Sequence, residues 1–310
     1  MSGTSGAPSV TAAAGEAWDE TKEILFRPFD VGRWFLLGFV TFLQALGQGC
    51  GVNLNFNVPL DDVEKGGNLP DIRPFLEKIR EHLPVVVVVA VLLVCLLLLL
   101  LLLFQWLSSR GTFAYLHIVL NRAYSLGEAW SARVSEAHSF FLGRIVFGFL
   151  AGLTLFLLVL PALAVLLSHR GHHSWTPGMI AVIFVSFLLV FVFAIFVAVF
   201  FLFLVDFIAP IQYRESLSFL PAIRRFREYL SAAPGVFVVY VLLKLLLSVG
   251  IGLLLCVGGF LTCCLLFCAL IIPVLSQTIL QPWHLFLRLW PIKLLDSIRP
   301  TVVSHEVILE

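Results

Sequence analysis

Residues 179–205, MIAVIFVSFLLVFVFAIFVAVFFLFLV, carry the strongest structural signal in the chain. These 27 residues contain no charge, and Ser186 supplies their only hydroxyl group. A helix of about 20 consecutive apolar residues is long enough to cross the hydrocarbon core of a bilayer. The run stops at Asp206, and polar side chains follow it as far as Glu215. We therefore predict that this stretch is a transmembrane helix.

The composition of the whole chain supports the same conclusion. The chain is 60% hydrophobic and 13% charged, and its mean hydropathy is +1.02. Soluble domains are closer to half apolar and a quarter charged, so this composition excludes an ordinary globular enzyme. The basic residues do not form a patch within a nucleic-acid-binding fold, so we expect no nucleic-acid partner.

Apolar runs along the chain predict an all-α integral membrane protein with six transmembrane helices. The second run is the plainest, because Leu96–Leu103 is an unbroken series of eight leucines. The first is the weakest, because glycine and glutamine residues interrupt it. The predicted spans cover residues 31–50, 85–107, 141–168, 179–207, 235–255 and 260–281.

The distribution of lysine and arginine predicts the orientation of these spans. The N-terminus, the 108–140 and 210–234 loops and the C-terminus, counted with Arg33 and Arg144 at the adjoining ends of their spans, hold fourteen basic residues, and the opposite side holds five. Cytoplasmic loops carry the excess of Lys and Arg. We therefore expect a multi-pass protein of the cytoplasmic (inner) membrane with both termini in the cytoplasm.

A short motif suggests an internal repeat. The letters Gly-Glu-Ala-Trp at residues 15–18 recur at 127–130, and Arg33 and Arg144 follow at nearly equal distances, where a span begins. A third segment, 219–230, keeps only the amphipathic pattern. The hypothesis is three repeats, 15–107, 127–209 and 215–281, each an in-plane cytoplasmic helix followed by a helical hairpin. The alternative is that the four-letter identity between 15–18 and 127–130 arose by chance. A disordered tail at 1–14 and an interfacial segment at 282–310 would flank the repeats.

Several local motifs resemble a known class of membrane protein. They are Arg-Pro-Phe at 27–29, Gly-Arg-Trp-Phe at 32–35, Asp-Phe-Ile-Ala-Pro at 206–210 and Pro-Trp at 282–283. With them the chain resembles uncharacterised prokaryotic polytopic membrane proteins of domain-of-unknown-function type. More distantly, it is similar to the membrane domain attached to some glycerophosphodiester phosphodiesterases. The resemblance covers residues 15–290 and implies a helical membrane domain of unknown role. The resemblance does not imply phosphodiesterase activity, because we find no counterpart of the soluble barrel of those enzymes in the sequence.

Lys244 is the most unusual residue for its position, since it lies ten residues into the fifth span. Ten residues rise about 15 Å along a helix, and an unpaired cation at that depth costs at least about 2.5 kcal/mol. Asp206 is the expected partner, reached by the flexible lysine stem. The pair would form an ion or proton site between spans four and five. The alternatives are a structural ion pair, or a lysine that extends to the headgroups.

Other polar residues are weaker candidates for a site. We expect Gln44 and Gln277 to form hydrogen bonds between helices. The histidines His169, His172 and His173 of one outer loop have the chemistry of a zinc site, although a solvated polar loop is the commoner arrangement. A disulfide between Cys50 and Cys256 is left open by the sequence. No cofactor is expected.

Three classes of function follow from these features. No nucleophile elbow, phosphate loop or zinc-protease motif occurs, which argues against an enzyme. The in-plane helices favour a non-catalytic scaffold or lipid-interacting component with membrane lipids as partners. A small transporter or channel that uses Lys244 and Asp206 is the alternative, and an intramembrane enzyme acting on lipid has the least support. Protein partners and oligomeric state stay open.

Overall fold

The computed structural model describes residues 9–47, 83–169, 176–262 and 270–309. Within these ranges the chain is helical and contains no β-strand, which confirms the all-α prediction. The helices are α1 Val10–Phe26, α2 Val31–Leu46, α4 Leu83–Asn121, α5 Leu126–Ser131, α6 Val134–Ser168, α7 Pro177–Phe203, the π-helix η2 Leu204–Ile208, α8 Ala209–Glu215, α9 Phe219–Ala232, α10 Pro234–Leu261, α12 Pro273–Ile279 and α13 Gln281–Leu309.

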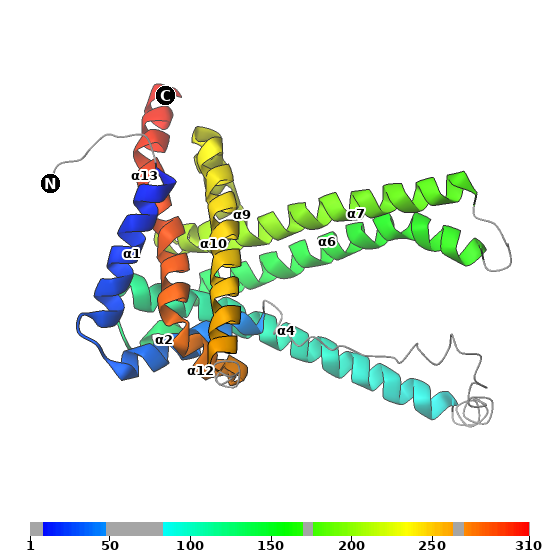
Figure 1. Ribbon diagram of the computed structural model, residues 1–310, viewed down its shortest axis with the longest axis horizontal. Helices are drawn as coiled ribbons and strands as arrows, with labels where there is room; N and C mark the ends of the chain where they lie inside the picture. Colours follow the sequence, from blue (N-terminus) through cyan, green and yellow to red (C-terminus); the bar gives the residue numbers. More distant parts are fainter. Residues whose placement is uncertain (1–8, 48–82, 170–175, 263–269, 310) are drawn as a thin grey trace.

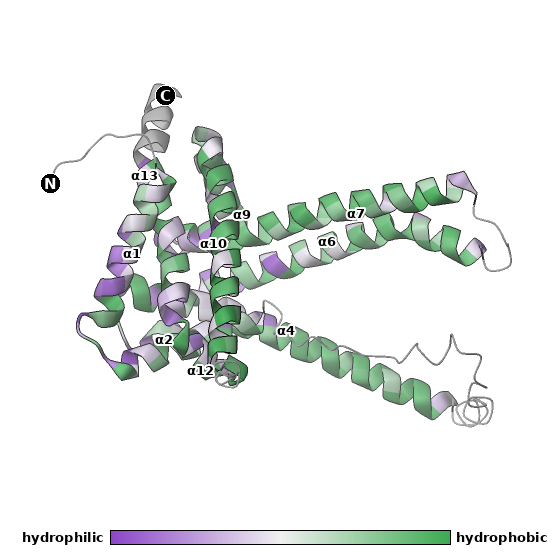
Figure 2. Cartoon of the chain, in the orientation of Figure 1, coloured by the Kyte–Doolittle hydropathy of each residue, from purple (hydrophilic) through white to green (hydrophobic). Residues whose placement is uncertain are grey.

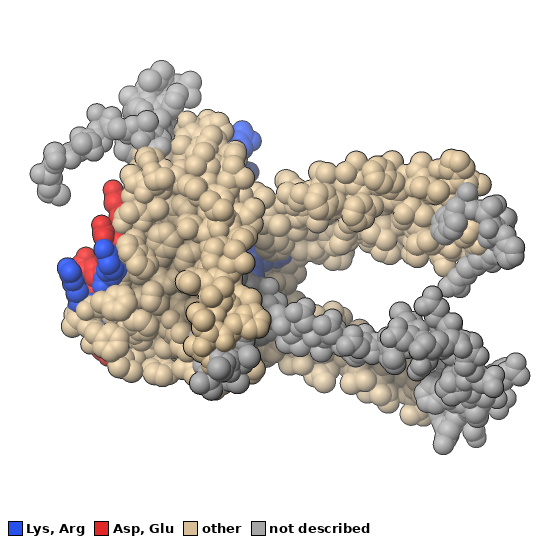
Figure 3. Space-filling view, in the orientation of Figure 1, with Lys and Arg blue, Asp and Glu red and all other residues tan. Residues whose placement is uncertain are grey.

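The molecule consists of long projecting helices and a group of packed helices from which they leave. α6 and α7 project side by side, and α4 projects separately in a similar direction, whereas α1, α10 and α13 run across that direction (Figure 1). We call residues 84–104, 145–168 and 177–203 the arms, and the packed helices at their root the base. The arms are hydrophobic along almost their whole length (Figure 2). Their sequences contain no charged residue, and on the face in Figure 3 the described charges lie outside them.

Four helical stretches are long and apolar enough to cross a membrane: Pro84–Asn121, Val134–Ser168, Pro177–Glu215 and Pro234–Leu261. At most 6% of the most apolar window of each is buried inside the protein. A soluble protein rarely exposes apolar patches of more than a few hundred Å². The four helices therefore indicate a membrane protein.

These four stretches contain the second to fifth predicted spans. The first predicted span, 31–50, corresponds to α2, which has only 16 residues. At 1.5 Å per residue such a helix is about 24 Å long, less than the roughly 30 Å of the hydrocarbon core. Its Leu37 and Val40 are buried in the base. The sixth predicted span, 260–281, includes residues outside the described ranges. Six spans and three repeats are therefore not established by the structure.

The connection predicted at 108–140 is largely helical, because α4 continues to Asn121 and α6 begins at Val134. Polar residues follow the leucine run but are buried in the base. There Ser108 Oγ donates to the carbonyl of Gln44 at 2.6 Å, and Thr112 Oγ1 donates to the carbonyl of Ser108 at 2.9 Å. Because their hydrogen bonds are satisfied inside the protein, these residues continue the helix.

The three predicted in-plane helices have different structures. α1 is continuous and α9 forms as expected, but the second is broken at Arg133, whose left-handed φ of 51° separates α5 from α6. The apolar side chains Ala17 of α1 and Phe226 of α9 are buried inside the protein. These faces therefore pack against other helices of the base.

Aromatic side chains form the centre of the base. Phe207 of η2 lies 5.1 Å from Phe237 and 5.0 Å from Tyr240, measured between ring centroids. Tyr240 in turn lies 4.9 Å from Trp290 of α13. The Trp290 indole N–H donates to the carbonyl of Val10 at 3.0 Å, which joins α13 to α1. The first and last described helices, α1 and α13, are thus linked within the base.

Gly38 permits α2 to approach α12 closely. A Cβ atom at this position would lie 2.1 Å from Thr278 Oγ1 and 2.9 Å from Thr278 Cα. No side chain fits that space without a backbone shift. This glycine, which weakened the apolar run in the sequence, therefore has a packing role.

Candidate functional site

Asp206 lies on a π-helical turn between α7 and α8. In η2 the N–H of Ala209 donates to the carbonyl of Leu204, five residues earlier. Pro210 has no N–H to continue the i to i−4 ladder onto Asp206, which explains why the regular helix is interrupted here. Such single π turns occur frequently at functional sites. Asp206 is 4% exposed and is directed into the protein.

Asp206 and Lys244 form an ion pair. Lys244 Nζ donates to Asp206 Oδ2, and the hydroxyl of Tyr240 donates to the same oxygen at 2.8 Å. Tyr240 and Lys244 are one turn apart on α10, so both reach the carboxylate from one helix face. The structure thus brings together the two residues that the sequence pointed to.

Arg288 of α13 places a second cation beside this pair. Its guanidinium donates to the carbonyl of Val205 at 3.0 Å and to Oε1 of Gln44. Burial lowers the pKa of Arg288, and the nearby Asp206 carboxylate raises it. Both hydrogen-bond acceptors are neutral, so Arg288 has no direct carboxylate partner among the described residues.

Arg144 of α6 is a third cation, and it is only 3% exposed. Its guanidinium donates to Ser108 Oγ and to the carbonyl of Gly47, both at 3.2 Å. Its Nε has no hydrogen-bond partner. Arg33, its counterpart in the proposed repeat, instead lies over the Tyr124 ring at 4.1 Å. The two arginines therefore have different surroundings.

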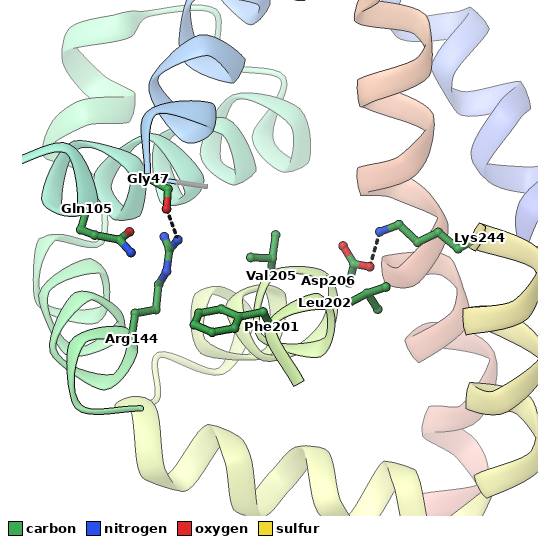
Figure 4. Close-up of a pocket in the computed structure, with 8 residues that line it drawn as sticks. All are labelled: Gly47, Gln105, Arg144, Phe201, Leu202, Val205, Asp206 and Lys244. Atoms are coloured by element: carbon green, nitrogen blue, oxygen red, sulfur yellow. Dashed lines mark hydrogen bonds and ion pairs between the residues drawn. The ribbon is translucent and has the colours of Figure 1, made fainter. Parts of the chain in front are cut away.

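Two neighbouring cavities surround these charged groups. The first, which we call the arm cavity, has a volume of about 540 Å³ and lies where α4, α6, α7 and α10 meet. The second, the base cavity, has a volume of about 350 Å³. Both are lined by Val205, Asp206 and Lys244. The arm cavity is further lined by Gly47, Gln105, Arg144, Phe201 and Leu202, all shown in Figure 4.

The two cavities together have an excess of positive charge. Arg144, Lys244 and Arg288 contribute three positive charges, and Asp206 contributes one negative charge, which leaves a formal charge of +2. Buried charges are normally paired, because an unpaired charge loses its hydration without compensation. An anion is the ligand that would complete this arrangement.

A family model described as a family of unknown function, DUF7544, matches residues 9–300. The chain belongs to this family. Membership confirms the expected relation to uncharacterised proteins, whereas similarity to the membrane domain of glycerophosphodiester phosphodiesterases is not shown. No curated protein and no solved structure matches the chain.

The remaining candidate residues of this DUF7544 member have varied positions. Gln44 is buried and accepts from Arg288, while its Nε2 has no partner, and Gln277 lines the base cavity. His169 follows the end of α6, but His172 and His173 lie outside the described residues. The described part of the chain contains no cluster of potential metal ligands. Cys50 is outside it too, so the disulfide prediction is not tested.

Sequence reasoning overlooked Arg144 and Arg288 as parts of the site. In the sequence, Arg144 marks only the start of a span in the proposed repeat, and Arg288 lies in the predicted interfacial segment 282–310. The contact between Arg288 and Gln44 joins residues 244 positions apart. Only packing of α13 against α2 could reveal it.

Proposed function

We propose that this protein is a non-catalytic membrane protein that binds the headgroup of an anionic lipid in the arm cavity. The observation that carries the proposal is the buried Arg144 guanidinium on the cavity wall, whose hydrogen-bond acceptors among the described residues are all neutral. A phosphodiester group would provide the missing negative charge. It would accept charge-assisted hydrogen bonds from Arg144 and attract Lys244.

The surroundings of the arm cavity suit an amphiphilic ligand. Phe201 and Leu202 line its apolar side, and Gln105 marks the point at which α4 leaves the base. On the N-terminal side of Gln105, the leucines of α4 from Leu92 to Leu103 are exposed on all sides of the helix. The α6–α7 arm and the α4 arm leave the base separately (Figure 1). Acyl chains would lie along these arms while the phosphate occupies the charged cavity.

Lipid titration tests this proposal. The protein in neutral detergent is titrated with phosphatidylglycerol or phosphatidylcholine, and binding is followed by native mass spectrometry. We expect the anionic lipid to bind at least about tenfold more tightly, because a hydrogen bond to a charged group contributes about 1.5–3 kcal/mol. Arg144→Gln should reduce phosphatidylglycerol binding about tenfold or more.

Arg227→Gln is the matched control, because Arg227 is exposed on α9 away from the cavity. It should change the affinity less than twofold. Equal affinity of the wild type for both lipids would refute the proposal, and so would undiminished binding by a folded Arg144→Gln protein. Circular dichroism establishes whether each variant retains its helix content.

A small transporter or channel is the second candidate. The observation that favours it is that Asp206 and Lys244 line both cavities and thus lie between them. Ion flux into proteoliposomes distinguishes the two functions. Flux that is lost in Lys244→Ala and Asp206→Asn would support transport, and zero flux in all three proteins would refute ion transport.

We further propose the full topology of six spans in three repeats, both termini in the cytoplasm, in the cytoplasmic membrane. Labelling of single cysteines tests it in a variant without the six native cysteines. Ser125→Cys, between α4 and α5, should react with an impermeant maleimide only from the cytoplasmic side. Thr176→Cys, before α7, should react only from the outside. Reaction of both from one side would contradict the topology.

A further inference from the structure

We propose that the base cavity is a binding site for one small monovalent anion, separate from the lipid site. The cavity lies between α2, α10, α12, α13 and η2, and residues from these helices line it. Its wall contains two cations, Lys244 and Arg288, and one acid, Asp206. The described residues of the wall therefore have a net formal charge of +1, which one monovalent anion neutralises.

Arg288 provides the main evidence for an anion site in the base cavity. Its guanidinium is held by the carbonyl of Val205 and the amide oxygen of Gln44, neither of which carries charge. Asp206 is close enough to affect its pKa, but the hydrogen bonds to that carboxylate come from Lys244 and Tyr240. A buried guanidinium without a bonded counterion is unfavourable, and an anion in the adjacent cavity would compensate its charge.

Two further polar groups lack partners at this cavity. Gln44 is 3% exposed, and its Nε2 has no hydrogen-bond acceptor among the described residues. His284 Nε2 is likewise buried without a partner. Burial, and secondarily Arg288, lower the pKa of His284 to about 4, so its ring is neutral at pH 7. A neutral imidazole can donate one N–H to an anion without adding charge to the site.

Asp206 limits the kind of ligand. Its carboxylate faces the same cavity and repels anions, so the site suits a single negative charge better than a doubly charged phosphate or sulfate. The cavity volume of about 350 Å³ accommodates a halide or a short carboxylate with its waters. Chloride is the simplest probe of this class.

Thermal unfolding at constant ionic strength tests the site. We expect the melting temperature in detergent to be about 5 °C higher in 100 mM chloride than in 100 mM gluconate, a six-carbon polyhydroxy carboxylate that is much bulkier than a halide and should fill the site poorly. Gln44→Glu places a carboxylate beside Arg288 and replaces the anion. It should unfold at a higher temperature than wild type in gluconate and lose the response to chloride.

Gln105→Glu is the matched control, because it introduces the same charge in the arm cavity and should keep the chloride response. No chloride effect in wild type would overturn the inference, and so would an equal effect in both glutamate variants, which indicates a general salt effect. Arg144→Gln should keep the chloride response, so a failure of the lipid proposal and a failure of the anion site are distinguishable.

Discussion

Asp206→Asn is expected to lower the free energy of unfolding by about 3–5 kcal/mol, the usual cost of removing one partner from a buried ion pair. The substitution keeps the shape of the side chain but removes the only acid that lines the two cavities among the described residues. Lys244, Arg288 and Arg144 would then face one another without compensation. Unfolding in mixed detergent micelles, followed by circular dichroism, measures the change.

Two variants separate charge from hydrogen bonding at this site. Lys244→Gln combined with Asp206→Asn removes the cation as well and should be more stable than Asp206→Asn alone. Tyr240→Phe removes one hydrogen bond to Asp206 and should cost only about 1–2 kcal/mol. If Asp206→Asn unfolds like wild type, the carboxylate does not compensate the buried cations.

Trp290→Ala is expected to cost about 3–5 kcal/mol, because it removes the largest fully buried side chain among the described residues and leaves a cavity. The indole lies 5.5 Å from the Phe286 ring and 4.9 Å from the Tyr240 ring, measured between centroids. Its N–H also donates a hydrogen bond to the carbonyl of Val10. We expect a fall in melting temperature on the order of 10 °C in detergent.

Trp290→Phe should recover more than half of that loss, since it keeps an aromatic ring in the core and removes only the indole N–H. Limited proteolysis reports the same contact, because α1 should become accessible to protease when its hydrogen bond to α13 is lost. An unchanged melting temperature for Trp290→Ala would show that α1 and α13 do not hold the base together.

The four membrane-capable helices could be predicted without any tertiary information. The uncharged apolar runs 179–205 and 84–104 are long enough by themselves to predict membrane-spanning helices. Inside a bilayer, each helix satisfies its own backbone hydrogen bonds, so the local sequence is sufficient to define it. The pairing of Lys244 with Asp206 was predictable for a related reason, because a buried lysine requires a counterion and few acids were near.

The packing of α2 in the base and the helical structure of residues 108–121 could not be predicted in the same way. α2 is apolar because it packs in the base, where Gly38 meets Thr278. Ser108 and Thr112 look like loop residues, but their hydroxyls bond within the protein. Apolar character does not distinguish contact with lipid from contact with protein, and polar character does not distinguish water from a buried partner.

Residues 179–205 by themselves determined that the protein has a helical membrane-embedded part, because the length of an apolar run is a property of the local sequence. Only the tertiary structure decided what happens where that stretch ends. There, η2 directs Asp206 inward, and α6, α10 and α13 bring Arg144, Lys244 and Arg288 to the same two cavities. The physical reason is that the free energy of a charged side chain depends on how far it is buried and on which groups pair with it. Those partners come from helices up to 244 residues apart in the chain.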